Sequence, residues 1–343
     1  MIFSKTLITW YLENKRDLPW RNTTNPYHIW LSEIMLQQTR VAQSLSYFFA
    51  FTEAFPTVFD LANAEEEQVL KLWQGLGYYS RARNLHATAK HIAYKLEGNF
   101  PNNYNDLLSL KGIGEYTAAA IASFAFNEIK PVVDGNVYRI LARYFGITTD
   151  IASTKAKKEF TQLASELIDP KKPALFNQAI MEFGALQCTP KSPNCSICPL
   201  NNSCLALAHK KVNELPIKLK KIKIKDRFLN YILIIDNNNK SIANKRTQKG
   251  IWHNLYELPL IETDCLETES DIKQKIIKDY PEEKKITLLT SESTIHKLSH
   301  QHLHIRFWKV ELEKTLDNSL HYEELMQLPF PIVLHNFMEN NKY

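Results

Sequence analysis

Two folded domains of different class are predicted by the sequence, an all-α domain followed by an α+β domain. The length of 343 residues exceeds what one core supports, and at about 150 residues per domain it corresponds to two. Eight of the nine glycines precede residue 210, where they separate segments of helical apolar spacing, and beyond residue 228 the pattern becomes that of strands. We therefore expect a helical domain over 1–209, a linker over 210–227 and an α+β domain over 228–343.

Short amphipathic helices account for the first domain. Apolar side chains recur at helical spacing over 29–37, 41–49, 61–73 and 84–96, and Gly or Pro residues end these segments. We expect one helix in each segment, and about eight to ten helices in all before residue 208.

A basic segment separates the two domains. Residues 210–227 carry eight Lys and Arg side chains against Glu214 and Asp226, and Pro216 would interrupt a helix there. A soluble tether is the first interpretation, and a strap that contacts phosphates is the alternative. In the domain that follows, we expect strands over 228–235 and 305–311 with a helix over 272–279 between them.

Composition excludes wholesale disorder, membrane insertion and secretion. The chain is 44% hydrophobic and 23% charged, which is ordinary globular usage. Its longest nearly apolar stretch, Ala118–Phe126, is far shorter than the ~20 residues that span a bilayer, and the N-terminus lacks a signal pattern. The net charge of +5 is only a weak indication of a polyanionic partner, because an ordinary solvated surface explains it equally well.

Two carboxylates stand in unlike surroundings. Glu33 lies among apolar residues on a predicted helix, where desolvation raises a carboxyl pKa toward that of a general acid at neutral pH. Asp134 precedes a predicted helix over 137–144, so we expect it to cap that helix, to be exposed and to stay ionised. Cleavage at the anomeric carbon of a sugar needs one acid of each kind. Taken singly, either residue would be read as structural.

A glycine pair precedes the most helical run of the chain. Gly112 and Gly114 stand two apart in LKGIGEYTAAA, and glycine permits backbone conformations that other residues resist. Such a turn can aim N–H groups at a phosphate from the start of the next helix. A plain helix–helix turn has the same pattern, so this motif alone is weak.

Four of the five cysteines fall within 17 residues, as Cys188-x6-Cys195-x2-Cys198-x5-Cys204. Four soft sulfur ligands select zinc or an iron-sulfur cluster, and the spacing alone leaves both open. The fifth, Cys265, is expected to be a free thiol. This usage fits metal ligation in a reducing compartment better than a disulfide framework, so a cytoplasmic location is expected.

Three of these motifs, taken together and in this order, resemble one family. The cysteine spacing, the LKGIG hairpin and the VDGNVYRILAR segment resemble the helix-hairpin-helix DNA glycosylases of the endonuclease III superfamily. Within that superfamily, LPWR, SEIMLQQTRV and GLGYYSRARNL are similar to the MutY-type adenine DNA glycosylases, and the likeness covers essentially the whole chain. The resemblance implies a 4Fe-4S cluster on the four cysteines, double-stranded DNA as the partner and a monomeric protein.

The resemblance also implies roles for residues of the first domain. It implies that Glu33 protonates the leaving adenine and that Asp134 stabilises the oxocarbenium-like sugar or forms a transient covalent adduct with it. It places Arg21 near the flipped adenine, and Gln38 and Tyr78 as wedges in the DNA stack. The full set of implied adenine and DNA contacts in this domain is Arg21, Leu36, Gln38, Tyr78, Gly112 and Gly114.

Position 116 separates two subclasses of the superfamily. Its bifunctional members have a lysine there, which forms a Schiff base with the sugar and leads to strand cleavage, whereas this chain has Tyr116. We therefore place Tyr116 in the catalytic group and expect a monofunctional glycosylase. Lys111 lies close in sequence, so weak lyase activity stays open.

The second domain resembles the Nudix-like C-terminal domain of the same family, through GIWHNLYELP and HKLSHQHLHIRFW. The resemblance implies that Ser299 and His300 recognise 8-oxoguanine opposite the adenine. This chain has Leu298 where the family usually has Phe, which puts ring stacking at that position in doubt. No run of Arg-Glu and paired acids follows 250–259, so we expect this domain to bind rather than to hydrolyse.

The expected function is base-excision repair: flipping of adenine from a mispair with 8-oxoguanine or guanine, and hydrolysis of its N-glycosidic bond. An endonuclease III-like lyase for oxidised pyrimidines is disfavoured by Tyr116 and by the extra domain. A mismatch-binding module without activity is disfavoured by the presence of both Glu33 and Asp134. A nucleotide pyrophosphatase in the second domain is disfavoured by the missing acids.

Overall fold

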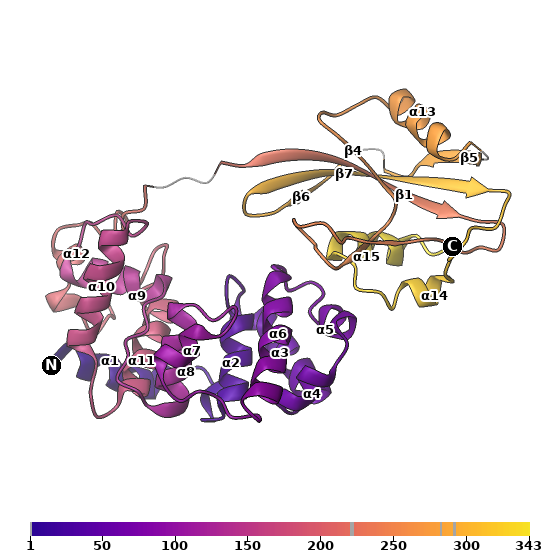
Figure 1. Cartoon of the computed structure of the whole chain (residues 1–343). Helices are drawn as coiled ribbons and strands as arrows, with labels where there is room; N and C mark the ends of the chain where they lie inside the picture. The colour runs from indigo at the N-terminus through magenta and orange to yellow at the C-terminus, as the bar shows by residue number, and fades with distance from the viewer. Residues whose placement is uncertain (1, 220–222, 282, 291–292) are drawn as a thin grey trace. The chain divides into compact units, whose positions relative to one another are not determined.

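The computed structural model describes residues 2–219, 223–281, 283–290 and 293–343 (Figure 1), so part of the predicted basic linker, 220–222, lies outside the described residues. By their contacts the residues form two compact units. The first unit contains Met1–Asn63 and Asn84–Lys220, and the second contains Ala64–Arg83 and Lys221–Tyr343. The segment Ala64–Arg83, which lies in the helical part of the sequence, is thus grouped with the sheet.

The part of the chain described before residue 209 holds twelve α-helices. They are α1 (Ile2–Asn14), α2 (Pro26–Met35), α3 (Val41–Ala54), α4 (Val58–Asn63), α5 (Glu66–Leu72), α6 (Ser80–Lys95), α7 (Tyr104–Ser109), α8 (Glu115–Phe126), α9 (Gly135–Phe145), α10 (Thr154–Leu167), α11 (Pro173–Leu186) and α12 (Leu205–Ala208). The expected eight to ten was too low. One reason is that 61–73 holds parts of two helices, because the backbone at Glu65, the residue just before α5, is extended, with φ −72° and ψ 143°.

Capping side chains fix where the helices nearest the site begin. Asn25 accepts a hydrogen bond from the Tyr27 N–H at 2.9 Å, and Pro26 stands at the first position of α2. The Asp134 carboxylate accepts the Val137 N–H at 2.8 Å and caps α9, as predicted. Gly146 ends α9 in the left-handed region, with φ +67°.

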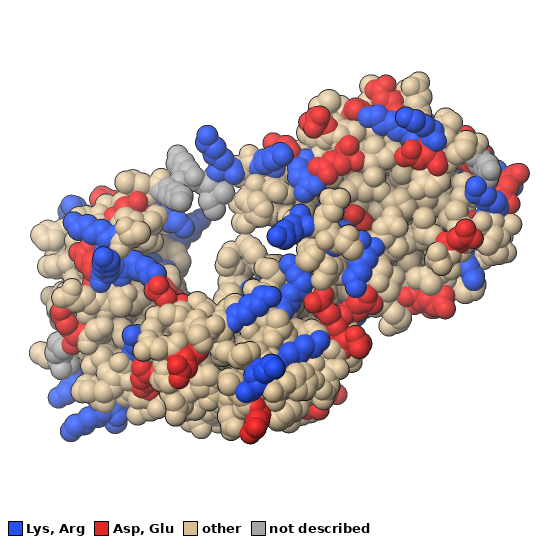
Figure 2. Space-filling model, in the orientation of Figure 1, with Lys and Arg blue, Asp and Glu red and all other residues tan. Residues whose placement is uncertain are grey.

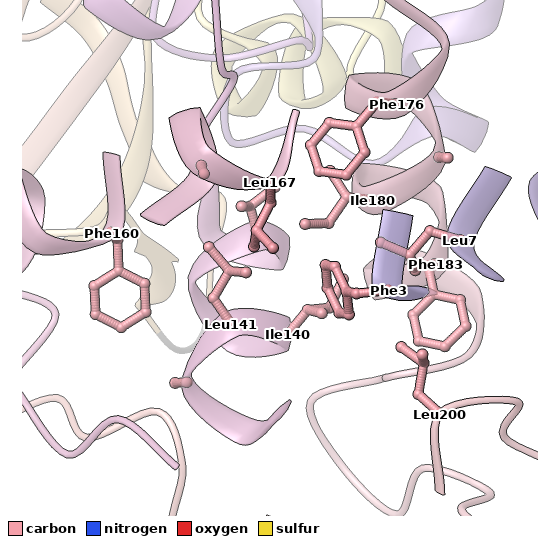
Figure 3. Packing of buried hydrophobic residues seen from close by; sticks show 14 of the residues in the cluster. Phe3, Leu7, Ile140, Leu141, Phe160, Leu167, Phe176, Ile180, Phe183 and Leu200 are labelled. Carbon is pink, nitrogen blue, oxygen red and sulfur yellow. The ribbon is translucent and has the colours of Figure 1, made fainter. Parts of the chain in front are cut away.

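Four helices supply most of a core cluster in the first unit. Figure 3 shows side chains of α1, α9, α10 and α11 facing one another, and α11 contributes Phe176, Ile180 and Phe183. Cys188, Cys198 and Cys204 pack against the edge of this cluster. Helix α11 is therefore held rigidly, and it links the core to the cysteine loop that follows it.

The second unit is built on a five-stranded mixed sheet in the order β4-β1-β7-β5, with β6 also paired to β7. Strands β1 and β7 run parallel and the other pairs run antiparallel. The strands are β1 (Lys225–Ile235), β2 (Asn244–Lys245), β3 (Tyr256–Glu257), β4 (Leu260–Thr263), β5 (Glu283–Leu288), β6 (Thr294–Lys297) and β7 (Gln301–Leu312), and the helices are α13 (Glu269–Asp279), α14 (Tyr322–Leu325) and α15 (Ile332–Asn340). The two strands and the helix expected from the sequence are confirmed.

Helices cover both faces of this sheet. On one face, Ile272 and Ile276 of α13 pack in a cluster with Trp308 of β7. On the other face, Phe337 of α15 stacks on Phe307 with ring centroids 3.7 Å apart. Burial on both faces explains why the end of β1 is a continuous apolar run.

Figure 2 shows Lys and Arg interspersed with Asp and Glu on the face in view. No helix within the described ranges is long and apolar enough to cross a membrane.

Candidate active site

A cavity of about 190 Å³ opens in the first unit beside α2, α8, α9 and α11. It brings together five residues predicted from the sequence, which are Arg21, Glu33, Leu36, Tyr116 and Asp134. These residues span more than a hundred positions of the chain, so it is tertiary packing that collects them. The polar lining that the sequence did not predict comes from Arg16, Ser32, Thr39, Asn136, Gln178 and Glu182.

Glu33 is the deeply buried acid of this cavity. Its side chain lies on α2 and the residue is only 4% exposed. The hydroxyl of Tyr116 donates to Glu33 Oε2 at 2.8 Å. Burial raises the pKa of Glu33 from 4.5 to about 7, and the hydrogen bond from Tyr116 only partly opposes this. The expected desolvation is confirmed, and the carboxyl can hold or release a proton near neutral pH.

Tyr116 stands in the first turn of α8 and lines the same cavity. Burial and the neighbouring Glu33 raise the pKa of the Tyr116 hydroxyl well above 10. The group therefore stays a neutral hydrogen-bond donor at physiological pH.

Asp134 is partly buried and lines the cavity. The expectation that it is exposed was wrong, because the cavity formed by α2, α8 and α11 encloses the start of α9. Burial raises the pKa of Asp134, opposed by hydrogen bonds from the Val137 N–H at 2.8 Å and from Asn136 Nδ2 at 2.7 Å. The two hydrogen bonds favour the ionised form.

The polar contacts of Asp134 continue toward the cysteine loop. Asn136 Oδ1 accepts from Arg139 Nη2 at 2.8 Å, and Arg139 Nε donates to the Cys188 carbonyl at 2.7 Å. One chain of hydrogen bonds thus connects the cavity to the first cysteine.

Arg21 is held by an acid that the sequence analysis missed. Its guanidinium donates to both carboxylate oxygens of Glu182, at 2.7 and 2.6 Å. Arg16 makes a second bidentate contact with the same carboxylate, at 2.8 and 2.6 Å. Although burial alone would raise it, these hydrogen bonds lower the pKa of Glu182 to about 2. The sequence did contain a signal for Glu182: it is an acid within an apolar helical run, which is the pattern that identified Glu33.

The glycine hairpin has one strained glycine rather than two. Gly112 has φ +77°, and a Cβ there would lie 2.6 Å from the Asn84 Cβ, so only glycine fits. Gly114 has φ −90° and ψ 175°, which any residue adopts, and a Cβ there would meet open space. The prediction that Gly114 needs a backbone conformation reserved for glycine is therefore wrong. Its missing side chain instead leaves the start of α8 open.

Gln38 and Tyr78 are exposed and sit on strained backbone. Both have left-handed φ values, 58° and 47°, which are unusual for residues with side chains. Gln38 lies in the turn after α2 of the first unit, and Tyr78 precedes α6 in the second unit. Strain of this kind persists where the surroundings fix it, often at binding sites.

The four predicted metal ligands are free, partly exposed thiols. Burial and the other three thiols raise the pKa of Cys198 to about 11, and Cys195 is shifted upward in the same way. Arg143 secures the loop by donating to the Thr189 and Pro190 carbonyls at 2.7 and 3.1 Å. Among the described residues, no three His, Cys, Asp or Glu side chains gather as they would round a single metal ion. The fifth thiol, Cys265, is free and exposed.

A second cavity, of about 500 Å³, lies within the second unit. The turn between β6 and β7 supplies Leu298, Ser299 and His300 to its lining, and the segment before α6 supplies Tyr78. Ser299 Oγ lies 3.2 Å from His300 Nδ1. Three of the residues predicted for DNA recognition thus line one cavity, together with Trp252, which the sequence analysis did not single out.

Three families match parts of the chain. Residues 31–170 match the HhH-GPD superfamily base excision DNA repair protein family, 188–204 match the iron-sulfur binding domain of endonuclease III, and 230–340 match the NUDIX domain. Fold and site together define the class, a helix-hairpin-helix base-excision DNA repair glycosylase with an iron-sulfur binding segment and a C-terminal Nudix domain.

Comparison with curated relatives identifies one family within this class. An adenine DNA glycosylase of Buchnera aphidicola subsp. Schizaphis graminum is 39% identical over 306 residues, which are 89% of this chain and 86% of that protein. One from Buchnera aphidicola subsp. Acyrthosiphon pisum is 35% identical over 99% of this chain and 98% of its own length. The chain belongs to the adenine DNA glycosylase family.

Solved structures agree on the fold of the helical part. A thermostable thymine-DNA glycosylase is 29% identical with a TM-score of 0.57, over 61% of this chain and 96% of that one. Endonuclease III in a non-covalent DNA complex is 21% identical with a TM-score of 0.53, over 61% of this chain and 95% of that one.

Proposed function

We propose that this chain removes adenine from duplex DNA where it is mispaired with 8-oxoguanine or guanine, as a monofunctional glycosylase. The observation that carries the proposal is the pair of acids in one cavity, Glu33 with a pKa near 7 and Asp134 at a helix start. The target adenine must leave the base stack, because its glycosidic bond is unreachable inside the duplex.

In the proposed mechanism, Glu33 donates a proton to the flipped adenine. A protonated base is a better leaving group, so the bond to the sugar breaks with positive charge developing on the sugar ring. Asp134, when ionised, stabilises that charge, and water then completes the hydrolysis. Tyr116 orients the Glu33 carboxyl through its 2.8 Å hydrogen bond.

Arg21 is the proposed contact to the flipped base in the cavity. Its two hydrogen bonds to Glu182 hold the guanidinium in one orientation at the cavity wall. A fixed donor costs less entropy on binding than a mobile one.

Monofunctional activity is supported by Tyr116. Lyase chemistry requires an amine that forms a Schiff base, and a phenol of raised pKa supplies neither the amine nor an anionic nucleophile. The expected product is an abasic site, which breaks only when alkali or heat is added.

Recognition of 8-oxoguanine is proposed for the second cavity. Ser299 and His300 offer hydrogen-bonding groups in its lining and Tyr78 an exposed ring, while Leu298 fills apolar space where an aromatic is usual. The wedge roles of Gln38 and Tyr78 are proposed from their exposed, strained positions.

A 4Fe-4S cluster is the proposed cofactor, held by Cys188, Cys195, Cys198 and Cys204. Cys188 and Cys204 help to raise the pKa of both Cys195 and Cys198, so the four thiols lie in one neighbourhood, and four sulfur ligands suit an iron-sulfur cluster. When bound, the cluster supplies local order to the loop rather than a step of the reaction. Iron and acid-labile sulfide in equal amounts are expected, and one zinc without sulfide would contradict this.

The direct test is adenine release from duplexes with adenine opposite 8-oxoguanine, guanine or thymine, analysed with and without alkali. We expect release opposite 8-oxoguanine and guanine, and strand breaks only after alkali. Breaks without alkali, trapped by borohydride as a protein-DNA adduct, would show a lyase instead. On this proposal, the protein acts as a monomer on chromosomal DNA in the cytoplasm.

A further inference from the structure

We infer that Asn177 is a positioning residue for Asp134: its buried side-chain amide fixes the loop that carries this carboxylate. The inference rests on the proposed function, because it concerns the acid that stabilises the sugar. Asn177 lies on α11, outside the cavity lining, so it does not touch the reacting atoms.

The loop before Asp134 has no regular structure of its own. Residues 127–134 connect α8 to α9 outside any helix or strand. Such a segment has many conformations unless its backbone groups are held, and a displacement of about 1 Å at a reacting group can reduce a rate about a hundredfold. The position of Asp134 therefore depends on whatever holds this loop.

Asn177 holds the loop at two backbone groups. Its Oδ1 accepts the Val132 N–H at 3.1 Å, and its Nδ2 donates to the Lys130 carbonyl at 2.8 Å. Nδ2 also donates to Ser123 Oγ on α8 at 2.9 Å. The loop offers one donor and one acceptor, so the side chain must accept on one side and donate on the other, which an amide does and a carboxylate does not.

Burial makes these hydrogen bonds decisive. Asn177 and Ser123 are both 0% exposed, and Val132 is 1% exposed and packs on Ala119 and Ala120. Water has no access to the Val132 N–H to replace a lost partner, so removal of the amide leaves this buried group to find another partner by moving the loop.

The same helix also packs against the first turns of α9, directly after the loop. A Cβ at Gly184 of α11 would lie 2.6 Å from the Asn136 Cβ, and the Gly184 carbonyl accepts from Arg139 at 2.6 Å. Helix α11 also lines the cavity through Gln178 and Glu182. One rigid element therefore sets the distance between Asp134 and the wall that faces the base.

The test compares Asn177→Leu and Asn177→Asp with the wild-type protein in single-turnover adenine release from an 8-oxoguanine:adenine duplex. We expect Asn177→Leu to lose about a hundredfold in rate at every pH. A protonated aspartic acid can accept from Val132 and donate to Lys130, so the rate of Asn177→Asp relative to wild type should recover as pH falls. The ratio cancels the titration of Glu33 and Asp134, which both proteins share.

A matched control variant and a binding measurement distinguish a positioning role of Asn177 from a purely structural role. Ser4 is 5% exposed and its hydroxyl donates to the Leu167 carbonyl at 2.6 Å, far from the loop in sequence. Ser4→Ala should lower the melting temperature as Asn177→Leu does, yet keep the wild-type rate. Affinity for a duplex with a non-cleavable 2′-fluoro adenine nucleotide should change less than threefold in the Asn177 variants.

Two results would overturn the inference: a folded Asn177→Leu protein with the wild-type rate, or an Asn177→Asp ratio that does not vary with pH. If Asn177→Leu fails to fold, the pH series on Asn177→Asp decides alone. Hydrogen exchange at the Val132 amide, expected to be faster in both variants, does not depend on activity. If the wild-type protein released no adenine, the proposed function would be contradicted. Hydrogen exchange at the Val132 amide would still test whether Asn177 holds the loop.

Discussion

At the scale of single residues, the proposed chemistry depends on two carboxyls whose surroundings differ. Glu33 has one hydrogen-bond donor, the Tyr116 hydroxyl, and is nine-tenths or more buried, so its neutral form is favoured. Asp134 has two donors, which oppose the rise in its pKa that burial causes. In the proposed mechanism, the difference in hydrogen-bond donors, not residue type, distinguishes the acid from the stabilising anion.

This difference predicts the pH dependence of the rate. In the proposed mechanism Glu33 is the general acid, and its pKa is about 7, so single-turnover adenine release should fall as pH rises above 7, about tenfold per pH unit. Glu33→Gln should bind duplex yet release almost no adenine, because an amide cannot donate the proton. A rate that is constant from pH 6 to pH 9, or a nearly active Glu33→Gln protein, would remove Glu33 from the mechanism.

The same pKa shift predicts a stability effect. Glu33 binds its proton more tightly in the folded chain than in the unfolded chain, so its contribution is complete below pH 4.5 and is lost as pH rises to about 7. The loss is on the order of 3 kcal/mol. Glu33→Gln should therefore resist urea better than wild type at pH 8 and not at pH 5. An equal difference at both pH values would contradict the assignment of this titration to Glu33.

A substitution at Asp134 can separate the stability that comes from helix capping from the contribution of the carboxylate to adenine release. Asn caps a helix about as well as Asp, so Asp134→Asn should keep the hydrogen bond from Val137 and change stability by less than about 1 kcal/mol. The neutral amide does little for a cationic sugar, so adenine release should be severely impaired. Loss of helical circular dichroism together with activity would favour a purely structural role.

At the scale of elements, the hairpin before α8 offers a matched pair of glycines. Gly112→Ala places a Cβ at left-handed φ and against Asn84, so it should cost about 1–2 kcal/mol or more in thermal unfolding. Gly114→Ala should leave stability within about 0.5 kcal/mol, because its Cβ meets open space. If phosphate approaches there, this variant should still bind duplex several-fold more weakly at fixed salt. Unchanged affinity would place the phosphate elsewhere.

The packing of helices and strands also explains which features of the site could be predicted from the sequence and which could not. The cap at Asp134, the buried acid at Glu33 and the cysteine loop are local patterns, readable within a few residues. The partners Glu182 and Asn177 are not, because they meet Arg21 and Val132 across 161 and 45 positions through the packing of α11. Burial of Asp134 was mispredicted for the same reason, since distant elements enclose it.

At the scale of the whole molecule, two cavities divide the proposed work. The cavity of about 190 Å³ with both acids belongs to the first unit, and the cavity of about 500 Å³ with Ser299 and His300 belongs to the second. Base removal and lesion recognition are thus assigned to different units of one chain. Substitutions in the second cavity should then alter the choice of mispair without altering the chemistry.

The double variant Ser299→Ala with His300→Ala tests this division. A hydrogen bond to a base edge is worth about 1–3 kcal/mol, so the preference for 8-oxoguanine:adenine over guanine:adenine should fall tenfold or more. The rate on guanine:adenine should stay close to wild type, because Glu33 and Asp134 are unchanged. Thr294→Ala, on the exposed part of β6 outside the cavity lining, is the matched control and should keep the preference. If the double variant kept the full preference, selectivity would instead be assigned to residues outside this turn, such as Tyr78. An equal loss of rate on both mispairs would indicate damage to folding rather than to recognition.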